Sequence, residues 1–330
     1  MTTTIETGAR PGAGSPYHRG WLIVAGKELT DHVRSLRFLI LLALMSLAGL
    51  AAVHSASGPI RDTADAASQT PSVFLYLFTL APERVPAFLE LIAILGPLLG
   101  IAFGFDAISG ERAQGTLPRL VAQPIHRDEI INGKFAAGIG AIAVALLGVV
   151  AIVGGYGTLR LGIGPSLGDL VRLMAFLILT VAYISIWLAL ATALSVVTRR
   201  ASTAALGALA VWLVLALFAG LIAGMVADAV HGVDASSTQE QLLANARTEL
   251  AVRHLSPDQL YRDAAGVLLN PSRQTTGILV VDPTSAALPS NLPLIDSLLL
   301  AWWQVTALVA GAVGLFVATY LAFLRQEVRA

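Results

Sequence analysis

Long stretches without a charged side chain recur along this sequence. Residues 38–60, 135–159, 173–198, 201–227 and 297–324 contain no Asp, Glu, Lys or Arg. A helix needs about 20 apolar residues to cross roughly 30 Å of hydrocarbon. Each stretch is long enough to cross a membrane once and too short to cross it twice, so the pattern predicts five membrane-spanning helices.

A sixth uncharged stretch, residues 91–105, is shorter than the others. As a helix it would extend for only roughly 22 Å, because each residue adds 1.5 Å. It can span the bilayer if Glu90 or Asp106 lies at the interface. We therefore interpret residues 86–108 as the second of six spans. Six spans place both ends of the chain on the same side of the membrane.

Residues 21–37 have the periodicity of an amphipathic helix. The apolar face carries Trp21, Leu22, Ala25, Leu29, Val33 and Leu36, and the polar face carries Lys27, Thr30, Asp31 and Arg34. We interpret this segment as an interfacial helix on the cytoplasmic leaflet, because tryptophan suits the headgroup zone. The alternative is a continuous extension of the first span into water.

The segment between the second and third spans, residues 109–134, mixes charges of both signs with apolar side chains. Gly115 interrupts a helix here, and Thr116 can cap a short following one. Arg127 begins the third span, whose first turn holds two acids suited to a helix N-terminus. A short amphipathic helix cannot bury its apolar edge alone, so this one needs the membrane or a partner protein. From the pattern alone, a solvated connector is an equal alternative.

The segment between the fifth and sixth spans, residues 228–296, is too long for a simple connection. Thr238 with Gln241, or Ser237 with Glu240, fits a capping box, and Ser256-Pro257-Asp258-Gln259 fits another. Apolar stripes follow both, so we expect two helices that form a small cap outside the membrane. Residues 278–281 are a candidate short strand.

The composition agrees with a membrane protein. Hydrophobic residues make up 56% of the 330 residues and charged residues only 13%, about half the usual share in soluble proteins. Mean hydropathy is +0.75. We therefore predict an all-α polytopic membrane protein. The lack of cysteine excludes disulfides and thiolate chemistry, and a net charge of zero gives no general attraction to nucleic acid.

Basic residues favour one orientation. With the N-terminus inside, the short external loops hold four of them: Arg61, Arg84, Arg160 and Arg172. The cytoplasmic segments hold thirteen: Arg10, Arg19, Lys27, Arg34, Arg37, Arg112, Arg119, Arg127, Lys134, Arg199, Arg200, Arg325 and Arg329. The long external segment is exempt from the comparison. We expect both termini in the cytoplasm, with residues 1–20 as a disordered tail lacking a signal-peptide core and residues 325–330 as a short tail.

Glycines mark two sites of close helix packing. Gly96, Gly100 and Gly104 share one face of the second span, and Gly220 and Gly224 form a similar pair in the fifth. Small residues at this spacing let another backbone approach. The pattern does not say whether the neighbour belongs to the same chain or to a second copy, and both interpretations stay open.

Few polar groups offer chemistry within the spans. Glu90 lies close to the hydrocarbon and is a candidate gate or substrate-path residue, because an intramembrane acid usually has a function. Asp106 is better explained as a cap of the loop that follows it. The six histidines are scattered without metal-ligand spacing, and the sequence has no P-loop. We predict no catalytic and no metal site in this chain.

Residues 106–134 resemble the type-2 ABC transporter permeases. The family pattern runs from an acid through Gly, Glu-Arg-Glu, Gly-Thr-Leu and leucines to Pro-x-Ser-Arg and Gly-Lys. The matching residues here are Asp106, Glu111, Arg112, Gly115, Thr116, Leu117, Leu120, Pro124, Arg127, Gly133 and Lys134. Three positions depart from the pattern: Ala113, Pro118 and His126. The interfacial helix, the six spans and residues 256–271 are also similar to members of this family.

The resemblance implies a non-catalytic permease subunit in a prokaryotic plasma membrane. In this family two permeases, here most simply a homodimer, work with two separate ATPase subunits. ATP and Mg are bound by the ATPases and no cofactor by the permease. The resemblance assigns Glu111, Arg112, Gly115, Thr116, Leu117, Leu120 and Arg127 to the element that docks on the ATPase.

Two functions are compatible with these expectations, and a third is not. The first is a permease that exports a substrate, which the apolar spans suggest is a lipid, peptide or amphipathic compound. The second is a permease-like mechanical transmitter that serves an extracytoplasmic partner through the external cap. The third, a membrane-embedded enzyme, needs converging polar residues that the spans do not supply.

Overall fold

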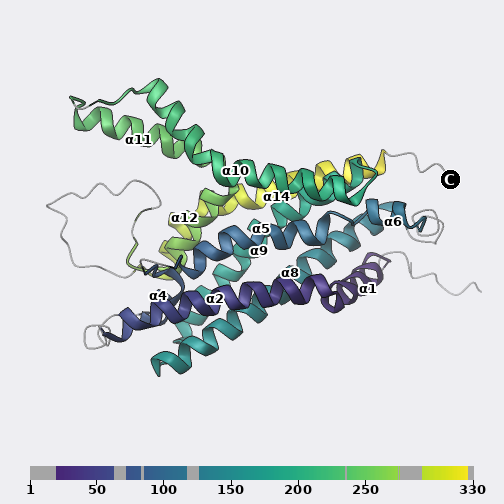
Figure 1. Cartoon of the computed structure of the whole chain (residues 1–330), viewed down its shortest axis with the longest axis horizontal. Coiled ribbons are helices and arrows are strands. Elements are labelled where there is room, and N and C mark those ends of the chain that lie inside the picture. The colour runs from purple at the N-terminus through teal and green to yellow at the C-terminus, as the bar shows by residue number, and fades with distance from the viewer. Residues whose placement is uncertain are drawn as a thin grey trace, which may run out of the picture.

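The computed structural model is a bundle of helices aligned along one long axis (Figure 1). It describes residues 20–62, 72–82, 85–116, 126–234, 236–273, 275 and 292–325. Within these ranges the regular structure is helical, with no strand, which confirms the all-α prediction. The candidate strand at residues 278–281 lies outside the described residues.

Six helices are long and apolar enough to cross a membrane, as the sequence predicts. They are α2 (Leu36–Asp62), α5 (Phe88–Gly104), α8 (Arg127–Leu161), α9 (Leu167–Val197), α10 (Ala201–Val230) and α14 (Trp302–Leu324). The last span differs from the expected 297–324. It begins at Trp302, and a separate helix, α13 (Leu294–Leu300), precedes it. A run without charges cannot reveal this break, because the helices on both sides of it are apolar.

A helix that the sequence analysis missed, α4 (Val73–Thr79), lies between the first two spans. Phe74, Leu75, Leu77 and Phe78 are buried in the core that α4 forms with the spans. Seven residues are too few for a clear periodic pattern, so burial of these four side chains, and not helix propensity, explains the element.

The N-terminal helix α1 (Gly20–Arg34) is separate from the first span, because Ser35 interrupts the helix before α2 begins. The Ser35 hydroxyl accepts a hydrogen bond from the backbone N–H of Phe38, 3.2 Å away. α1 packs on the start of α8, with Val24 buried there, while Trp21 is exposed. A straight extension of the span is therefore wrong, and contact of the exposed residues with lipid stays a prediction.

The second and fourth spans pack closely along the predicted glycine face. A Cβ on Gly100 would lie 2.6 Å from the carbonyl oxygen of Ile184 in α9, and one on Gly104 would lie 2.7 Å from that of Leu188. Gly96 faces the side chain of Ile184. In the structure, the neighbour that approaches these three glycines is α9 of the same chain. This face is not free to meet a second copy.

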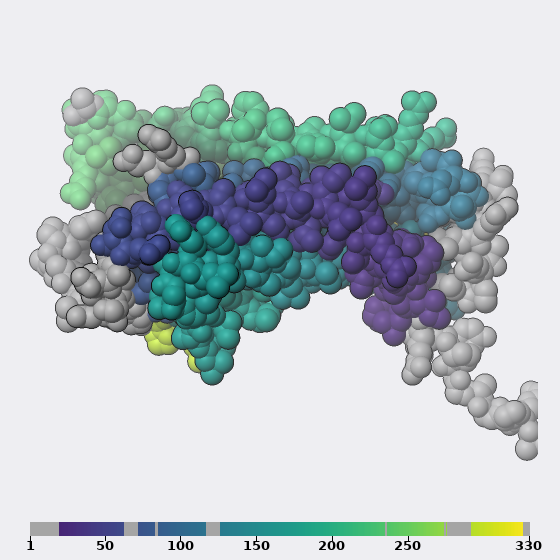
Figure 2. All heavy atoms as spheres, turned by 60° about the horizontal axis from the view of Figure 1, so that its bottom comes forward, coloured from purple at the N-terminus to yellow at the C-terminus, as the bar shows by residue number. Residues whose placement is uncertain are grey.

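The glycine pair of α10 has different surroundings. Gly220 lies near the Arg253 guanidinium of helix α11 (Gln239–Arg253), and no described atom lies within 4 Å of a Cβ built on Gly224. α10 is mostly exposed along its length. Figure 2 shows α10 and α11 forming one long edge of the molecule. In the part of the chain that the structure describes, no span packs closely on the Gly220–Gly224 pair.

The two helices expected to form one external cap lie in different places. α11 packs along the outer part of α10, and the pair projects from the body at the upper left of Figure 1. Helix α12 (Pro257–Leu269) instead packs among α9, α14, α5 and α4. The capping box at Thr238 and Gln241 is confirmed. The one predicted at Ser256 is wrong, because the Ser256 side chain makes no capping hydrogen bond, although Pro257 occupies the first turn of α12. The sequence locates both helices, but it does not show that α12 enters the bundle.

Candidate functional site

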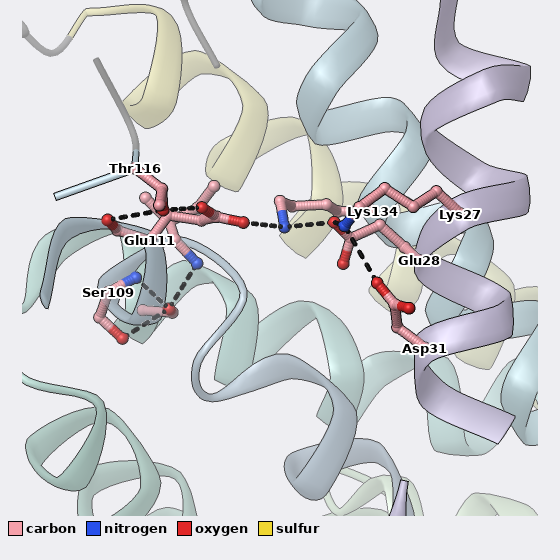
Figure 3. A network of polar contacts seen from close by, with 9 residues as sticks. Lys27, Glu28, Asp31, Ser109, Glu111, Thr116 and Lys134 are labelled. Atoms are coloured by element: carbon pink, nitrogen blue, oxygen red, sulfur yellow. Dashed lines mark hydrogen bonds and ion pairs between the residues drawn. The ribbon is translucent and has the colours of Figure 1, made fainter. Parts of the chain in front are cut away.

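A cluster of charged side chains lies at the end of the bundle that holds α6 (Ser109–Ala113), here called the α6 end. α6 follows the second span after a short turn, and it lies near α1 and the start of α8 (Figure 1). Figure 3 shows a line of contacts from Thr116 through Glu111 and Lys134 to Glu28. The cluster thus joins three helices that are distant in sequence.

Lys134 is the centre of this cluster. Its Nζ lies 2.9 Å from Glu28 Oε1 in α1 and 3.2 Å from Glu111 Oε1 in α6. The Lys134 side chain is only 5% exposed. A buried ammonium is stable when carboxylates compensate the lost hydration. Lys134 therefore needs both carboxylates, and through them it ties α1 and α6 to the third span.

Lys27, the other lysine of the chain, has a different environment. It contacts Glu28 at 3.5 Å and Asp31 at 3.0 Å, and its side chain is 69% exposed. The hydrogen bond to Asp31 raises the pKa of Lys27. An exposed pair of this kind contributes at most about 1 kcal/mol. The two lysines share the Glu28 carboxylate, but only Lys134 is buried with it.

Gly115 and Thr116 turn the chain back onto α6 just after this helix ends. Gly115 has φ +67°, in the left-handed region that glycine adopts without strain. This turn brings Thr116 back so that its hydroxyl donates to the Glu111 carboxylate and, at 3.2 Å, to the Glu111 backbone carbonyl. The spacing of Glu111, Gly115 and Thr116 therefore has a local cause, since the glycine permits the turn and the threonine fixes the carboxylate.

Arg112 holds α6 against the end of α9. Its Nη1 donates to the carbonyl oxygens of Val196, at 2.9 Å, and Thr198, at 3.1 Å. The last carbonyls of a helix lack partners within the helix, and they carry the negative end of its dipole. The guanidinium of Arg112 supplies both the missing hydrogen-bond donors and a positive charge at the negative end of the dipole. The family resemblance assigns Glu111 and Arg112 to a surface that docks on the ATPase, and the structure shows that both have partners within this chain.

Ser195 is a site residue that sequence reasoning missed. Its Oγ accepts hydrogen bonds from the backbone N–H groups of Ile108 and Ser109, each at 3.0 Å, and lies 3.0 Å from Ser109 Oγ. Ser195 and Ser109 are both fully buried. The bonds fix the turn between the second span and α6 on the fourth span. A single serine near the end of an apolar span gives no pattern from which this could be foreseen.

The cavity between α1 and α6 has a volume of about 310 Å³. Its charged lining consists of Lys27, Arg37, Lys134, Glu28, Asp31, Asp106 and Glu111. Three cations against four carboxylates leave one excess negative charge. Asp106 pairs with Arg37 at 2.8 Å and does not cap the loop, and burial lowers the pKa of His32, which also lines the cavity. Among the described residues, no three acidic or histidine side chains are arranged so that they could hold a metal ion.

The other predicted coupling residues are placed as follows. Arg127 is the first residue of α8, and Glu129 in the same turn accepts from the backbone N–H of His126 at 3.2 Å. Leu117 and Leu120 lie outside the described residues. The structure therefore brings Glu111, Arg112, Gly115 and Thr116 together at the α6 end.

Glu90 lies at the opposite end of the second span, in the first turn of α5, and does not join the α6 cluster. It forms an ion pair with Arg262 of α12, whose Nε lies 2.8 Å from Asp258 Oδ2. Burial raises the pKa of Asp258 to about 6, although a hydrogen bond from Tyr183 opposes the shift. Glu90 thus faces the buried helix α12.

This pKa gives a prediction for stability against pH. A carboxyl whose pKa is raised by folding favours the folded state most at low pH, and the contribution is lost as pH rises from about 4 to about 6. Asp258→Asn is expected to remove about 1–3 kcal/mol of this pH dependence. Thermal unfolding of the purified protein and the variant at pH 4.5 and 7 measures it. An unchanged difference between the two pH values would contradict the assignment.

Two comparisons with known proteins bear on the chain. The ABC-2 family transporter protein model matches residues 22–328. The chain is 29% identical over 302 residues to the probable ABC transporter permease protein NosY of Stutzerimonas stutzeri, covering 88% of this chain and 96% of that protein. It is 31% identical over 204 residues to the protein of the same description from Pseudomonas aeruginosa, covering 57% of this chain and 64% of that protein. The family match includes α1 from Leu22 and every later helix.

Proposed function

Since the chain belongs to the ABC-2 transporter family, we propose that it is the membrane permease of a complex that uses ATP hydrolysis to export a substrate. Membership makes the chain a multi-pass membrane protein and a permease subunit that associates with an ATPase. Export and the coupling to ATP are the proposed part. The observation that carries them is the attachment of α6, by Arg112, Ser195 and Lys134, to three other helices.

The composition of the complex follows the same proposal. Two copies of this chain would pair with two ATPase subunits in a prokaryotic plasma membrane, with both termini in the cytoplasm. ATP and Mg belong to the ATPases, and this chain binds no cofactor. The sequence supports this division of work, because it lacks a P-loop. Basic residues favour placing the α6 end in the cytoplasm.

The contacts at the α6 end suggest how motion would pass into the membrane. An ATPase that moves α6 would move α9 through Arg112 and Ser195, because these bonds join α6 and its preceding turn to that span. It would also move α1 and α8 through Lys134. Packing and hydrogen-bond networks with two arrangements can carry such coupling. On this proposal α6 is a lever attached to the spans at several points.

The proposal is tested with Glu111→Ala and Arg112→Ala in the complex with its ATPase. Each change removes charge-assisted hydrogen bonds, which typically contribute about 1.5–3 kcal/mol. We expect both variants to insert in the membrane, with at least about a tenfold loss of transport per ATP hydrolysed, since 1.4 kcal/mol corresponds to a factor of 10. The measurements are co-purification with the ATPase, transport in vesicles and ATPase rate.

Glu249→Ala is the matched control, because it removes a glutamate that pairs with Arg253 inside the distant helix α11. It should leave all three measurements unchanged. If Glu111→Ala and Arg112→Ala also retain normal assembly and transport, these residues do not couple the permease to its ATPase.

A second function, a mechanical transmitter that drives an extracytoplasmic partner, is favoured by the projecting α10–α11 pair (Figure 1). This pair offers a surface away from the bundle, as docking of another protein would require. Addition of transported compounds to the reconstituted complex separates the two functions. A transporter shows substrate-stimulated ATPase activity, whereas a transmitter responds only to its protein partner.

A further inference from the structure

A second polar cavity lies at the end of the bundle opposite α6. It has a volume of about 370 Å³, and it lies between α12 and the segment where α4 ends and α5 begins. Its charged lining consists of Glu90, Arg262, Asp263 and Arg273. Ligand pockets have volumes of about 300–1,000 Å³ and a few placed polar groups. The cavity therefore has room for a small ligand or a lipid head group, and its charges determine which chemistry it can bind.

Two of these charges form a pair with each other. Arg262 of α12 forms an ion pair with Glu90 of α5, and its Nε also lies 2.8 Å from Asp258 Oδ2 in its own helix. Arg262 therefore already has two carboxylates as partners, and an added anion would be repelled by both of them. This part of the cavity does not favour a negatively charged ligand.

The carboxylate of Asp263 also has close partners. Its Oδ2 lies 2.8 Å from His254 Nε2, and its Oδ1 accepts a hydrogen bond from Gln259 Nε2 at 3.1 Å. The Asp263 side chain is only 6% exposed. Both of its oxygens are therefore engaged by groups other than arginine, and Asp263 does not depend on Arg273 for a hydrogen-bond partner.

Arg273 is the charged group of this cavity whose contacts are loose. Its Nη2 lies 3.6 Å from Asp263 Oδ1, and its side chain is 36% exposed. This distance is longer than that of a hydrogen bond. A guanidinium carries several N–H donors in a planar fork, and those of Arg273 form no hydrogen bond with a described residue. Arg273 therefore presents unused donors to the cavity.

The position of Arg273 is fixed although its donors are unused. A Cβ built on Gly266 would overlap Nη1 of Arg273, so the glycine provides the space in which the guanidinium lies against α12. The backbone N–H of Arg273 donates to the carbonyl oxygen of Asn270 at 3.0 Å. The preceding residue, Ser272, is hydrogen-bonded to Tyr76 of α4 at 2.9 Å. A donor that is already held in place loses little conformational freedom when it binds a ligand.

We propose that this cavity binds a phosphate group through the guanidinium of Arg273. The planar fork of arginine matches two oxygens of a phosphate. The charges that line the cavity, two arginines and two carboxylates, cancel, so binding depends on direct hydrogen bonds and not on attraction from a distance. The phosphate belongs either to the head group of an anionic lipid or to a small solute, because both present the same oxygens.

The test uses the purified full-length protein in detergent, without nucleotide. It is titrated with sodium phosphate against sodium chloride, and with short-chain phosphatidylglycerol against diacylglycerol, which has no phosphate. A ligand that binds the folded state raises the unfolding temperature in a saturable way, which gives its affinity. Arg273→Gln should weaken this affinity by about tenfold or more. Arg273→Lys should restore only part of it, because lysine keeps the charge without the planar fork.

Arg247→Gln is the matched control, because it removes an exposed arginine of α11 that does not line the cavity, and it should leave the affinity unchanged. Gly266→Ala keeps the charge but displaces the guanidinium, so it should weaken binding and gives the same test if Arg273→Gln does not fold.

Binding of phosphatidylglycerol alone would identify a lipid as the source of the phosphate, and binding of inorganic phosphate would identify a solute. Either result supports the site if it depends on Arg273. The site is overturned if neither compound binds, if Arg273→Gln and Gly266→Ala leave the affinity unchanged, or if Arg247→Gln lowers it equally. These outcomes need no ATPase, so they are independent of the proposed coupling at α6.

Discussion

Replacing Lys134 with methionine is expected to destabilise the protein by about 3–5 kcal/mol, the usual cost of removing one partner from a buried ion pair. Methionine can fill the space of the lysine stem, but it removes the ammonium that lies between the carboxylates of Glu28 and Glu111. Glu28 then keeps only the looser contact with the exposed Lys27, at 3.5 Å. These carboxylates are only 16% and 22% exposed. Water can replace little of the lost interaction, so the charge removed, and not the volume, should decide the effect.

Lys27→Met is a matched control in the same cluster. Lys27 also contacts Glu28, but its side chain is 69% exposed, so the change should cost no more than about 1 kcal/mol. Thermal unfolding of the purified variants measures both costs. Adding Glu111→Gln to Lys134→Met should recover part of the loss, because it removes one uncompensated charge. Equal costs for the two lysine variants would show that burial does not distinguish them.

The Lys134→Met variant also connects stability with the proposed coupling. Through Lys134, α6 contacts both α1 and the third span, and through Arg112 it contacts the end of the fourth. A lever that is joined at several points distributes a displacement over several helices. Loss of Lys134 should therefore loosen α1 relative to α6, while Arg112 still holds α6 to the end of α9.

Much of the fold could be predicted because lipid imposes simple requirements. A helix is the only open-chain element that satisfies its own backbone groups in hydrocarbon, so charge-free runs of sufficient length become spans. This argument placed all six spans, including α5, whose uncharged stretch is short because Glu90 limits it at one end and Asp106 at the other. It also identified the glycine face of α5, because only small residues allow two backbones to meet.

Other elements depend on tertiary contacts that leave no local pattern. α4 is a helix because its apolar side chains are buried, and α13 is separate from α14 although both are apolar. The capping and proline signals correctly located α12, but its burial among four helices depends on partners far away in sequence. An amphipathic pattern shows that a helix has a face to bury, but it does not show which other elements will bury that face.

In the candidate site, too, local features could be predicted and contacts with distant residues could not. The family resemblance singled out Glu111, Gly115 and Thr116, and the structure explains their spacing by a left-handed turn that returns Thr116 to Glu111. The resemblance placed Glu111 and Arg112 on a surface for the ATPase, and it did not point to Ser195. Their internal contacts involve Lys134 and the end of α9, and a sequence does not show which distant groups meet a given charge.

The second large effect on stability is expected at Gly100, on the glycine face of α5. Gly100→Ala is expected to cost about 3 kcal/mol or more, because the new Cβ would lie 2.6 Å from the backbone oxygen of Ile184 and 3.0 Å from the backbone nitrogen of Leu188. Backbone atoms cannot turn aside as a side chain can. The methyl group can be accommodated only if α5 and α9 move apart along the core of the bundle.

A graded series tests this explanation. Gly96→Ala meets side-chain atoms and no backbone, the nearest being two atoms of Ile184 at 3.0 Å, so it should cost less than Gly100→Ala. Gly224→Ala meets no described atom within 4 Å, so the better helix propensity of alanine should leave stability unchanged or raise it by up to about 1 kcal/mol. Thermal unfolding of the detergent-solubilised variants gives the order of their stabilities. If Gly224→Ala is as damaging as Gly100→Ala, something other than the described residues packs on α10 at Gly224. A second copy of the protein would then be the first partner to test, because the face of α5 is already filled by α9.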